Sequence, residues 1–316
     1  MTEGVAAMDM RKLRYFAGVV EAKSISRAAV TLGVAQPALS KSIQALELDL
    51  GTPLLQRSQQ GVTTTEAGAQ LYEHCQILFK QLDRARSDIR RAVGVPSGHV
   101  VVGMPHSLVA VIALPLLQMM TKRFPEVRLE LRQDQSHFLA AAVRTNKLDF
   151  AVIASPRSRS GLVCQSLLVE ELFFITGRND GNDDSDTGIS FEDASRREFV
   201  LPSMGNGLRA CAEAHFRARS LPLDVKYEVD AIALITQCVD AGLGASLLPG
   251  GCLERDTNYA RMQVRAFGEG GCHRGIVLSH AEEATISPAA GCAMQLVKEI
   301  TRGLVTEGSW LGARLD

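Results

Sequence analysis

The chain has 316 residues, of which 46% are hydrophobic and 22% charged, and its net charge is −1. This composition is typical of a globular protein and excludes a disordered or collagen-like chain, and the length favours two domains. The charge is uneven, because residues 1–98 hold 12 Lys and Arg against 9 Asp and Glu. A mildly basic front before a more acidic remainder is consistent with a polyanionic partner for the N-terminal part.

The seven cysteines are scattered, with no CxxC pair and no histidine at zinc-ligand spacing. This pattern argues against a disulfide framework and predicts reduced thiols and no metal site. The first residues lack the apolar run of a signal peptide, and no run of 18 apolar residues occurs. We therefore expect a cytoplasmic protein that does not span a membrane.

Residues 9–20 and 24–46 predict three short helices. Asp9 is a candidate cap for the first, and Ile25, Ala28, Ala29 and Leu32 give the second one apolar stripe. Gly33 follows that stripe directly, which is typical of a helix end, and Pro37 opens the third helix. Two short helices meeting at a tight turn form a helix-turn-helix, with the first helix completing its core.

The third helix has an apolar side and a polar side. Leu39, Ile43 and Leu46 keep the helical period and are expected to face inward. Its other side, and its first turn, are predicted to contact DNA through Gln36, Pro37, Ser40, Lys41 and Gln44. Gln can pair with an adenine edge, Lys with guanine or phosphate, and Ser with either. An ordinary helical hairpin with a solvated face explains these residues equally well.

After Gly51 the segment TPLLQRSQQGVTTT predicts a small hairpin beside the third helix, a wing in which Arg57 is expected to contact a minor groove or a phosphate. From residue 65 to 93 a helix without proline is predicted. Its apolar positions recur at alternating spacings of four and three, which indicates a heptad seam for self-association. The predicted dimerisation residues are Leu71, Leu78, Leu82 and Ile89. A single amphipathic helix packed on its own domain is the alternative.

Residues 10–68, with the run RAAVTLGVAQPALSKSIQALE and the segment TTTEAG, resemble the winged helix-turn-helix of the LysR-type transcriptional regulators. The long helix, a hinge at residues 94–98 and an α/β remainder follow in that family's order, so the resemblance covers nearly the whole chain. It implies a winged helix-turn-helix at 8–65, a linker and dimerisation helix at 66–93, and a two-lobed effector-binding domain at 94–316 of the periplasmic-binding-protein type. The lobes are expected at about 98–161 with 268–305, and at about 162–267. Ala35 departs from the family, where Ser or Thr is common, and leaves the third helix without a side-chain cap.

Beyond residue 98 strands and helices alternate, which predicts α/β lobes with parallel sheets. The predicted elements include one helix from 105 to about 123 and two strands at 162–168 and 171–176. Ligands of such sheets bind past the carboxyl ends of the strands, against helix N-termini. The predicted effector-binding residues are Pro105, His106, Ser107, Gln135, Ser136, Ser155, Ser203 and Met204. Serine hydroxyls and helix N–H groups suit a small anion such as a carboxylate, although each residue is equally explained as a plain helix cap.

Sequence motifs for an enzyme are weak in this chain. GNGLRA at 205–210 matches a variant of the dinucleotide fingerprint, but it lies far along the chain behind the predicted DNA-binding domain. No HExxH or GxSxG motif occurs. We predict a sequence-specific DNA-binding regulator without a cofactor, controlled by a small effector. The alternative is a solute-binding or enzymatic α/β protein whose N-terminal helices serve only assembly. The resemblance implies promoter DNA with a dyad, a second copy of the chain, as a dimer or a dimer of dimers, and RNA polymerase as partners.

Overall fold

The computed structural model describes residues 9–58, 61–91, 96–154, 160–178, 188–253, 255, 259–268, 270–282, 284 and 286–316. Side chains of residues 57, 58, 80, 83, 84, 86–91 and 259 lie outside that description. The chain divides into two compact units, residues 1–85 and 86–316, and the division falls inside the long helix α4 (Glu66–Arg91). The sequence analysis placed domain boundaries at 65 and 93, on either side of this helix. None of the described helices is long and apolar enough to cross a bilayer.

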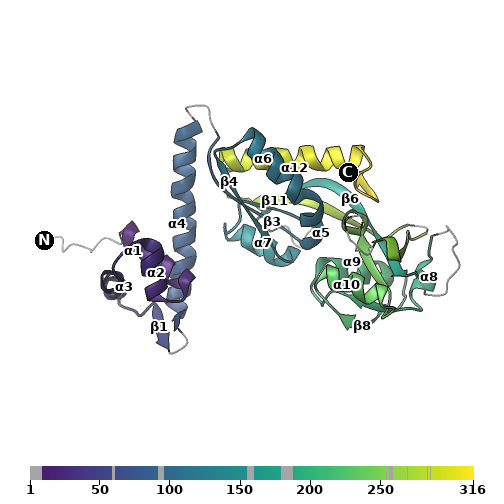
Figure 1. Cartoon of the computed structure of the whole chain (residues 1–316), viewed down its shortest axis with the longest axis horizontal. Helices are drawn as coiled ribbons and strands as arrows, with labels where there is room; N and C mark the ends of the chain where they lie inside the picture. The colour runs from purple at the N-terminus through teal and green to yellow at the C-terminus, as the bar shows by residue number, and fades with distance from the viewer. Residues whose placement is uncertain are drawn as a thin grey trace. The chain divides into compact units, whose positions relative to one another are not determined.

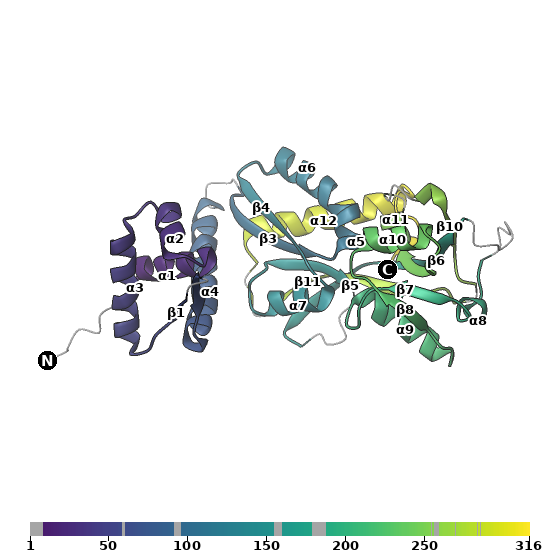
Figure 2. The same ribbon diagram turned by 60° about the horizontal axis from the view of Figure 1, so that its bottom comes forward.

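The first unit contains the predicted three helices and hairpin (Figures 1 and 2). Its elements are α1 (Met10–Ala22), α2 (Ile25–Leu32), α3 (Gln36–Leu50), β1 (Leu55–Ser58), β2 (Gly61–Thr64) and the first part of α4. Asp9 caps α1 by accepting a hydrogen bond from the backbone N–H of Arg11 at 2.9 Å. Gly33 ends α2 with a φ of +66°, and Ala35 gives α3 no side-chain cap, both as the sequence predicts. Phe16, Leu39 and Ile43 are among the side chains that fill the core between these helices.

A mixed sheet of eight strands forms the framework of the second unit within the described residues. Its main order is β10 (Met262–Arg265), β6 (Leu162–Gly177), β11 (His273–Ala281), β5 (Phe150–Ala154), β3 (Gly98–Met104) and β4 (Val127–Gln133). The strands β9 (Ser246–Pro249) and β12 (Ala313–Leu315) also pair with β6. Only β3, β4 and β5 pair in parallel in this sheet; the pairings of β6 and β11 are antiparallel, so the parallel-sheet prediction is wrong for this part.

Helices cover both faces of β3, β5 and β11. In Figure 1, α12 (Pro288–Thr306) and α6 (Leu114–Arg123) lie on one face, and α7 (Ser136–Arg144) lies on the other. The sequence predicts one helix from 105 to 123, but the structure has a short turn α5 (His106–Leu108), a π-helical turn at Val109–Ala113, and then α6. Pro115, in the first turn of α6, has no N–H to donate to the preceding turn, and the backbone widens there.

A second core lies around the other half of β6. It is covered by α9 (Gly207–Ala218) and α10 (Ile232–Asp240), with the parallel pair β7 (Glu198–Leu201) and β8 (Asp224–Glu228) (Figure 2). Two short helices, α8 (Phe191–Ala194) and α11 (Gly250–Leu253), complete it. The sequence analysis separated residues 162–168 and 171–176 as two strands, but β6 runs unbroken, with Leu168 in the first core and Leu172 in the second. One long strand therefore connects the two lobes.

Candidate nucleic-acid interface and effector cavity

The outer face of α3 carries the predicted DNA-contacting side chains. Leu39, Ile43 and Leu46 are at most 1% exposed, so the opposite side of the helix is fixed against the core. Around the first turns of the helix Gln36, Pro37, Lys41 and Gln44 are exposed and Ser40 is half-buried. The helix thus presents short polar groups and one ammonium group to solvent at its N-terminal half, the part of a recognition helix that enters a major groove.

Hydrogen bonds attach the wing to the helices. The carboxylate of Glu47 on α3 accepts the N–H groups of Leu54 and Leu55 at 2.8 and 3.1 Å, just where β1 begins. On the other strand, the N–H of Val62 donates to the carbonyl of Lys23 at 3.1 Å. A side chain at Gly61 would collide with that carbonyl, so the close approach requires glycine there. The backbone of Arg57 lies in β1 opposite Val62, while its side chain lies outside the described part of the chain.

The predicted seam of α4 divides into two parts. Leu71 is half-buried and packs, with the fully buried Cys75, against the core of its own unit. Further along, Leu78 and Leu82 are 44% and 38% exposed. The side chain of Ile89 lies outside the description. The alternative of a helix packed on its own domain thus holds for the first turns, and the exposed leucines begin about two turns later.

A cavity of about 260 Å³ lies between the two lobes of the second unit, at the carboxyl ends of β3, β4 and β7. Five predicted effector-binding residues line it: Pro105, His106, Ser107, Gln135 and Ser136. Met204 lines an adjoining space of about 690 Å³, which shares Ser136, Gly207 and Arg274 with the first. Ser203 lines neither space. Its backbone N–H and its hydroxyl donate hydrogen bonds to the carboxylate of Asp230 at 3.1 and 2.9 Å. Ser155 lies outside the described residues.

Capping explains some polar groups at the cavity. Asp134 accepts the N–H of Gln135 at 2.8 Å, and Asn206 caps α9 by accepting the N–H of Leu208 at 2.9 Å. Of these two, only Asn206 is a helix cap, because α5 and α7 begin after Pro105 and Gln135 without a side-chain cap. The capping alternative therefore does not account for Pro105 or Gln135.

Arg274 on β11 is the main cavity residue that the sequence analysis missed. Its guanidinium donates to Glu170 on β6 at 2.7 Å and to the hydroxyl of Ser107 at 2.9 Å, and it lines both spaces. Trp310 donates to the second oxygen of Glu170 at 3.1 Å. Arg274 and Glu170 are 7% and 1% exposed, so the pair is buried. Arg274 stands inside a strand pattern, and no local motif in the sequence marks it as facing a cavity.

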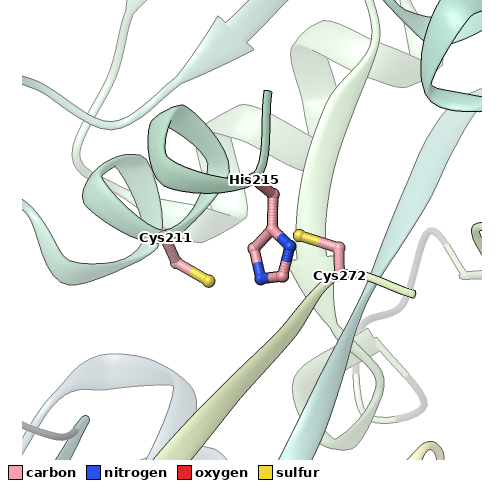
Figure 3. Close-up of side chains that lie close together, drawn as sticks. All are labelled: Cys211, His215 and Cys272. Atoms are coloured by element: carbon pink, nitrogen blue, oxygen red, sulfur yellow. The ribbon is translucent and has the colours of Figure 1, made fainter. Parts of the chain in front are cut away.

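Behind the larger space Cys211, His215 and Cys272 lie together, with one possible ligand atom of each within 4.8 Å of the others (Figure 3). A hydrogen bond from Cys272, helped by His215 and the charge of Arg274, lowers the pKa of Cys211, and the same hydrogen bond with burial raises the pKa of Cys272. The expectation of no histidine at zinc-ligand spacing overlooked Cys211 and His215, which stand four residues apart on α9, a spacing that two ligands of one metal can have. The third member was missed because the fold brings Cys272 to this helix from about 60 positions later in the sequence.

Two family models match the chain in the order of its two units. Residues 10–69 match the bacterial regulatory helix-turn-helix protein of the lysR family, and residues 94–302 match the LysR substrate binding domain. The second match alone spans more than half of the chain. The protein therefore belongs to the LysR family of transcriptional regulators, with a DNA-binding helix-turn-helix and an effector-binding domain, and it is not an enzyme.

Relatives agree with this assignment over most of their length. The chain is 29% identical to the nitrogen assimilation regulatory protein nac of Klebsiella aerogenes, over 96% of this chain and 97% of that protein. It is 31% identical to the transcriptional regulator BudR of Raoultella terrigena, over 77% of this chain and 84% of the other.

Among solved structures, the fold is similar to CbnR complexed with its target DNA, with a TM-score of 0.72 and 18% identity over 93% of this chain and all of the other. It is also similar to a full-length OxyR variant of Pseudomonas aeruginosa, with a TM-score of 0.71 and 22% identity over 94% of this chain and 95% of the other.

Proposed function

We propose that the exposed N-terminal half of α3 reads bases in the major groove, with Lys41, Gln44 and Gln36 as the contacting side chains. The observation that carries this assignment is the division of α3 into a buried apolar side and an exposed polar side at the family's helix-turn-helix. Arg57 on the wing contacts the adjacent backbone or minor groove. Such contacts give binding that weakens steeply with salt, because each neutralised phosphate releases counterions.

Two copies of the chain associate through the α4 seam, at the exposed Leu78 and Leu82 and at Ile89, whose side chain lies outside the description. The exposed leucines recur four residues apart on the surface of a helix of 26 residues, about 40 Å long. A two-fold pair places two recognition helices on a pseudo-palindrome.

The proposed role includes a cytoplasmic location and contact with RNA polymerase. Co-sedimentation of polymerase with the protein on promoter DNA tests the contact with polymerase.

The effector is a small carboxylate that binds in the cavity between the lobes. Ser107 and Ser136 line the cavity with Arg274, which offers a guanidinium, while Asp134 and Asp230 at its rim favour a ligand that also carries a hydrogen-bond donor. A ligand that contacts both lobes stabilises one lobe arrangement over others, and this differential affinity alters the placement of the DNA-binding units.

A thermal-shift screen of the full chain tests the ligand class. Hydroxy and amino acids are expected to raise the melting temperature, because a ligand that binds only the folded state stabilises it, while matched neutral alcohols and amides leave it unchanged. Ser136→Ala reduces the shift in melting temperature. Ser195→Ala is the control and preserves the shift, because the hydroxyl of Ser195 donates to the carbonyl of Glu192 outside the cavity. Shifts that appear equally with neutral analogues would exclude a carboxylate effector.

A further inference from the structure

The cluster of Cys211, His215 and Cys272 combines two thiols with one imidazole. Cys211 and His215 stand four residues apart on α9, and therefore on the same face of that helix. Cys272 is fully buried and comes directly before β11. Figure 3 shows the imidazole of His215 between the two sulfur atoms, which reach it from α9 and from the start of β11.

The separations are about 1 Å larger at most than those around a bound metal. With metal–sulfur bonds of about 2.3 Å and metal–nitrogen bonds of about 2.0 Å, the ligand atoms of a tetrahedral zinc site lie about 3.4–3.8 Å apart. The present ligand atoms lie within 4.8 Å of one another, so side-chain movements of about 1 Å close them around an ion. Two thiolates also neutralise the charge of a divalent ion. Arg274, the nearby cation on β11, is already paired with Glu170.

Supporting contacts around the histidine resemble those of metal sites. The Nε2 atom of His215 lies 3.0 Å from the carbonyl oxygen of His273. Metal-bound imidazoles commonly donate their second N–H to a backbone carbonyl, which fixes the ring and its tautomer. The backbone N–H of His273 also lies 3.2 Å from Nε2. The site proposed below requires the tautomer in which Nε2 donates to the carbonyl and Nδ1 binds the ion.

The cluster has an entry path and a place for a fourth ligand. Cys211 lines the 690 Å³ space together with Ala210, Glu213 and Arg274. An ion held by three protein groups and open on this side accepts water or a small molecule from the space, as in three-ligand zinc sites.

We propose that Cys211, His215 and Cys272 form a site for one thiophilic metal ion, of the zinc(II) type, with its fourth position open to the cavity. The ion links α9 to Cys272, the residue directly before β11. It is a ligand of this domain in addition to the organic effector. The proposal does not depend on the identity of the organic effector or on DNA binding.

The full chain, reduced and stripped of metal with a chelator, is titrated with zinc(II) and with cobalt(II). We expect one equivalent of either ion to bind, and cobalt to give the thiolate charge-transfer band and intense visible absorption of a tetrahedral site. Cys211→Ser weakens binding by at least about 100-fold, more than loss of a hydrogen bond to a ligand does. Cys238→Ser, on α10 outside the cluster, binds as the parent chain does.

Circular dichroism of each variant checks folding. If Cys272→Ser fails to fold, Cys211→Ser and His215→Asn provide the test, because both side chains are only half-buried. Failure of the reduced parent chain to retain any ion, or retention by Cys211→Ser equal to that of the parent, overturns the proposal. A chain that binds no metal and instead forms a Cys211–Cys272 disulfide in air overturns it too, and identifies a redox pair.

Discussion

At the scale of single residues, the buried pair of Arg274 and Glu170 connects β11 to β6, the long strand that contributes to both lobes. Arg274 lies on β11 and Glu170 on β6, in register with each other across the antiparallel ladder. Ser107 accepts a further hydrogen bond from Arg274, and Trp310 donates one to Glu170. A charge pair of this kind is costly to bury, but removing one partner is costlier still. Arg274 therefore stays at the cavity in a defined orientation.

Glu170→Ala is expected to lower the free energy of unfolding by about 3–5 kcal/mol, because it leaves the guanidinium buried without its partner. Chemical denaturation monitored by circular dichroism measures the loss. The control is Glu299→Ala, which breaks the exposed pair with Arg123 and is expected to cost less than about 1 kcal/mol. Equal, small losses in both variants would show that the buried pair is unimportant for stability.

Cys211 is expected to react as a thiolate at pH values below those of an ordinary cysteine. The hydrogen bond from Cys272, His215 and the charge of Arg274 all lower its pKa. In the reduced, metal-free chain, the rate of alkylation at this residue should stay high as the pH falls toward neutrality, while the rate for a free thiol such as glutathione falls. Mass spectrometry of the Cys211 peptide and of the glutathione adduct follows both rates. Parallel pH profiles for Cys211 and glutathione would contradict the lowered pKa.

Lys41→Ala is expected to weaken DNA binding about tenfold and to make the slope of log affinity against log salt shallower by about 0.9, because its ammonium group, besides facing base edges, neutralises one phosphate. Fluorescence anisotropy across a salt series measures both quantities. Lys122→Ala, an exposed lysine on α6 of the effector unit, serves as the charge-matched control. Identical salt slopes for the parent chain and Lys41→Ala would remove this lysine from the interface.

At the scale of elements, α4 has two roles: its first turns pack against its own unit, and its later turns carry the leucines of the proposed dimer contact. Its first turns carry Cys75 into the core and place the hydroxyl of Tyr72 3.1 Å from the carboxylate of Glu21. The following turns expose Leu78 and Leu82. Apolar side chains repeated on an exposed helix face favour a second helix as their partner.

Leu78→Asp is expected to give monomers in multi-angle light scattering, since a carboxylate within the seam remains unpaired when two copies meet. Ala69→Asp is the control, because this exposed position lies about two and a half turns before Leu78 and therefore on the opposite side of α4. Circular dichroism confirms that each variant keeps its helices. An assembly that survives Leu78→Asp would move the self-association surface away from this part of α4.

Local patterns predicted some elements well. Period, caps and Pro37 located α1, α2 and α3 because those signals are local, and the hairpin followed from its turn residues. Features that depend on contacts between distant residues could not be predicted from the sequence. The unbroken β6, the burial of Cys75, and the approach of Cys272 and Arg274 to the cavity depend on tertiary contacts that no window of sequence contains.

At the scale of the whole molecule, the DNA-binding face and the effector cavity belong to different compact units. The polar face of α3 belongs to one compact unit, and the cavity with its metal-type cluster belongs to the other. Each lobe of the second unit has its own core, and β6 contributes to both. A ligand held between the lobes acts on their relative arrangement without entering either core.

The central claim is that two copies of α3 read one double helix together, and selection of bound sequences from a random duplex library by the full chain tests it most directly. The account predicts enrichment of a dyad whose half-sites lie one helical turn, about 10 base pairs, or a multiple of it apart, and loss of that enrichment with Lys41→Ala and Leu78→Asp. Enrichment of an asymmetric single site, or of the same dyad by both variants at parental affinity, would contradict it.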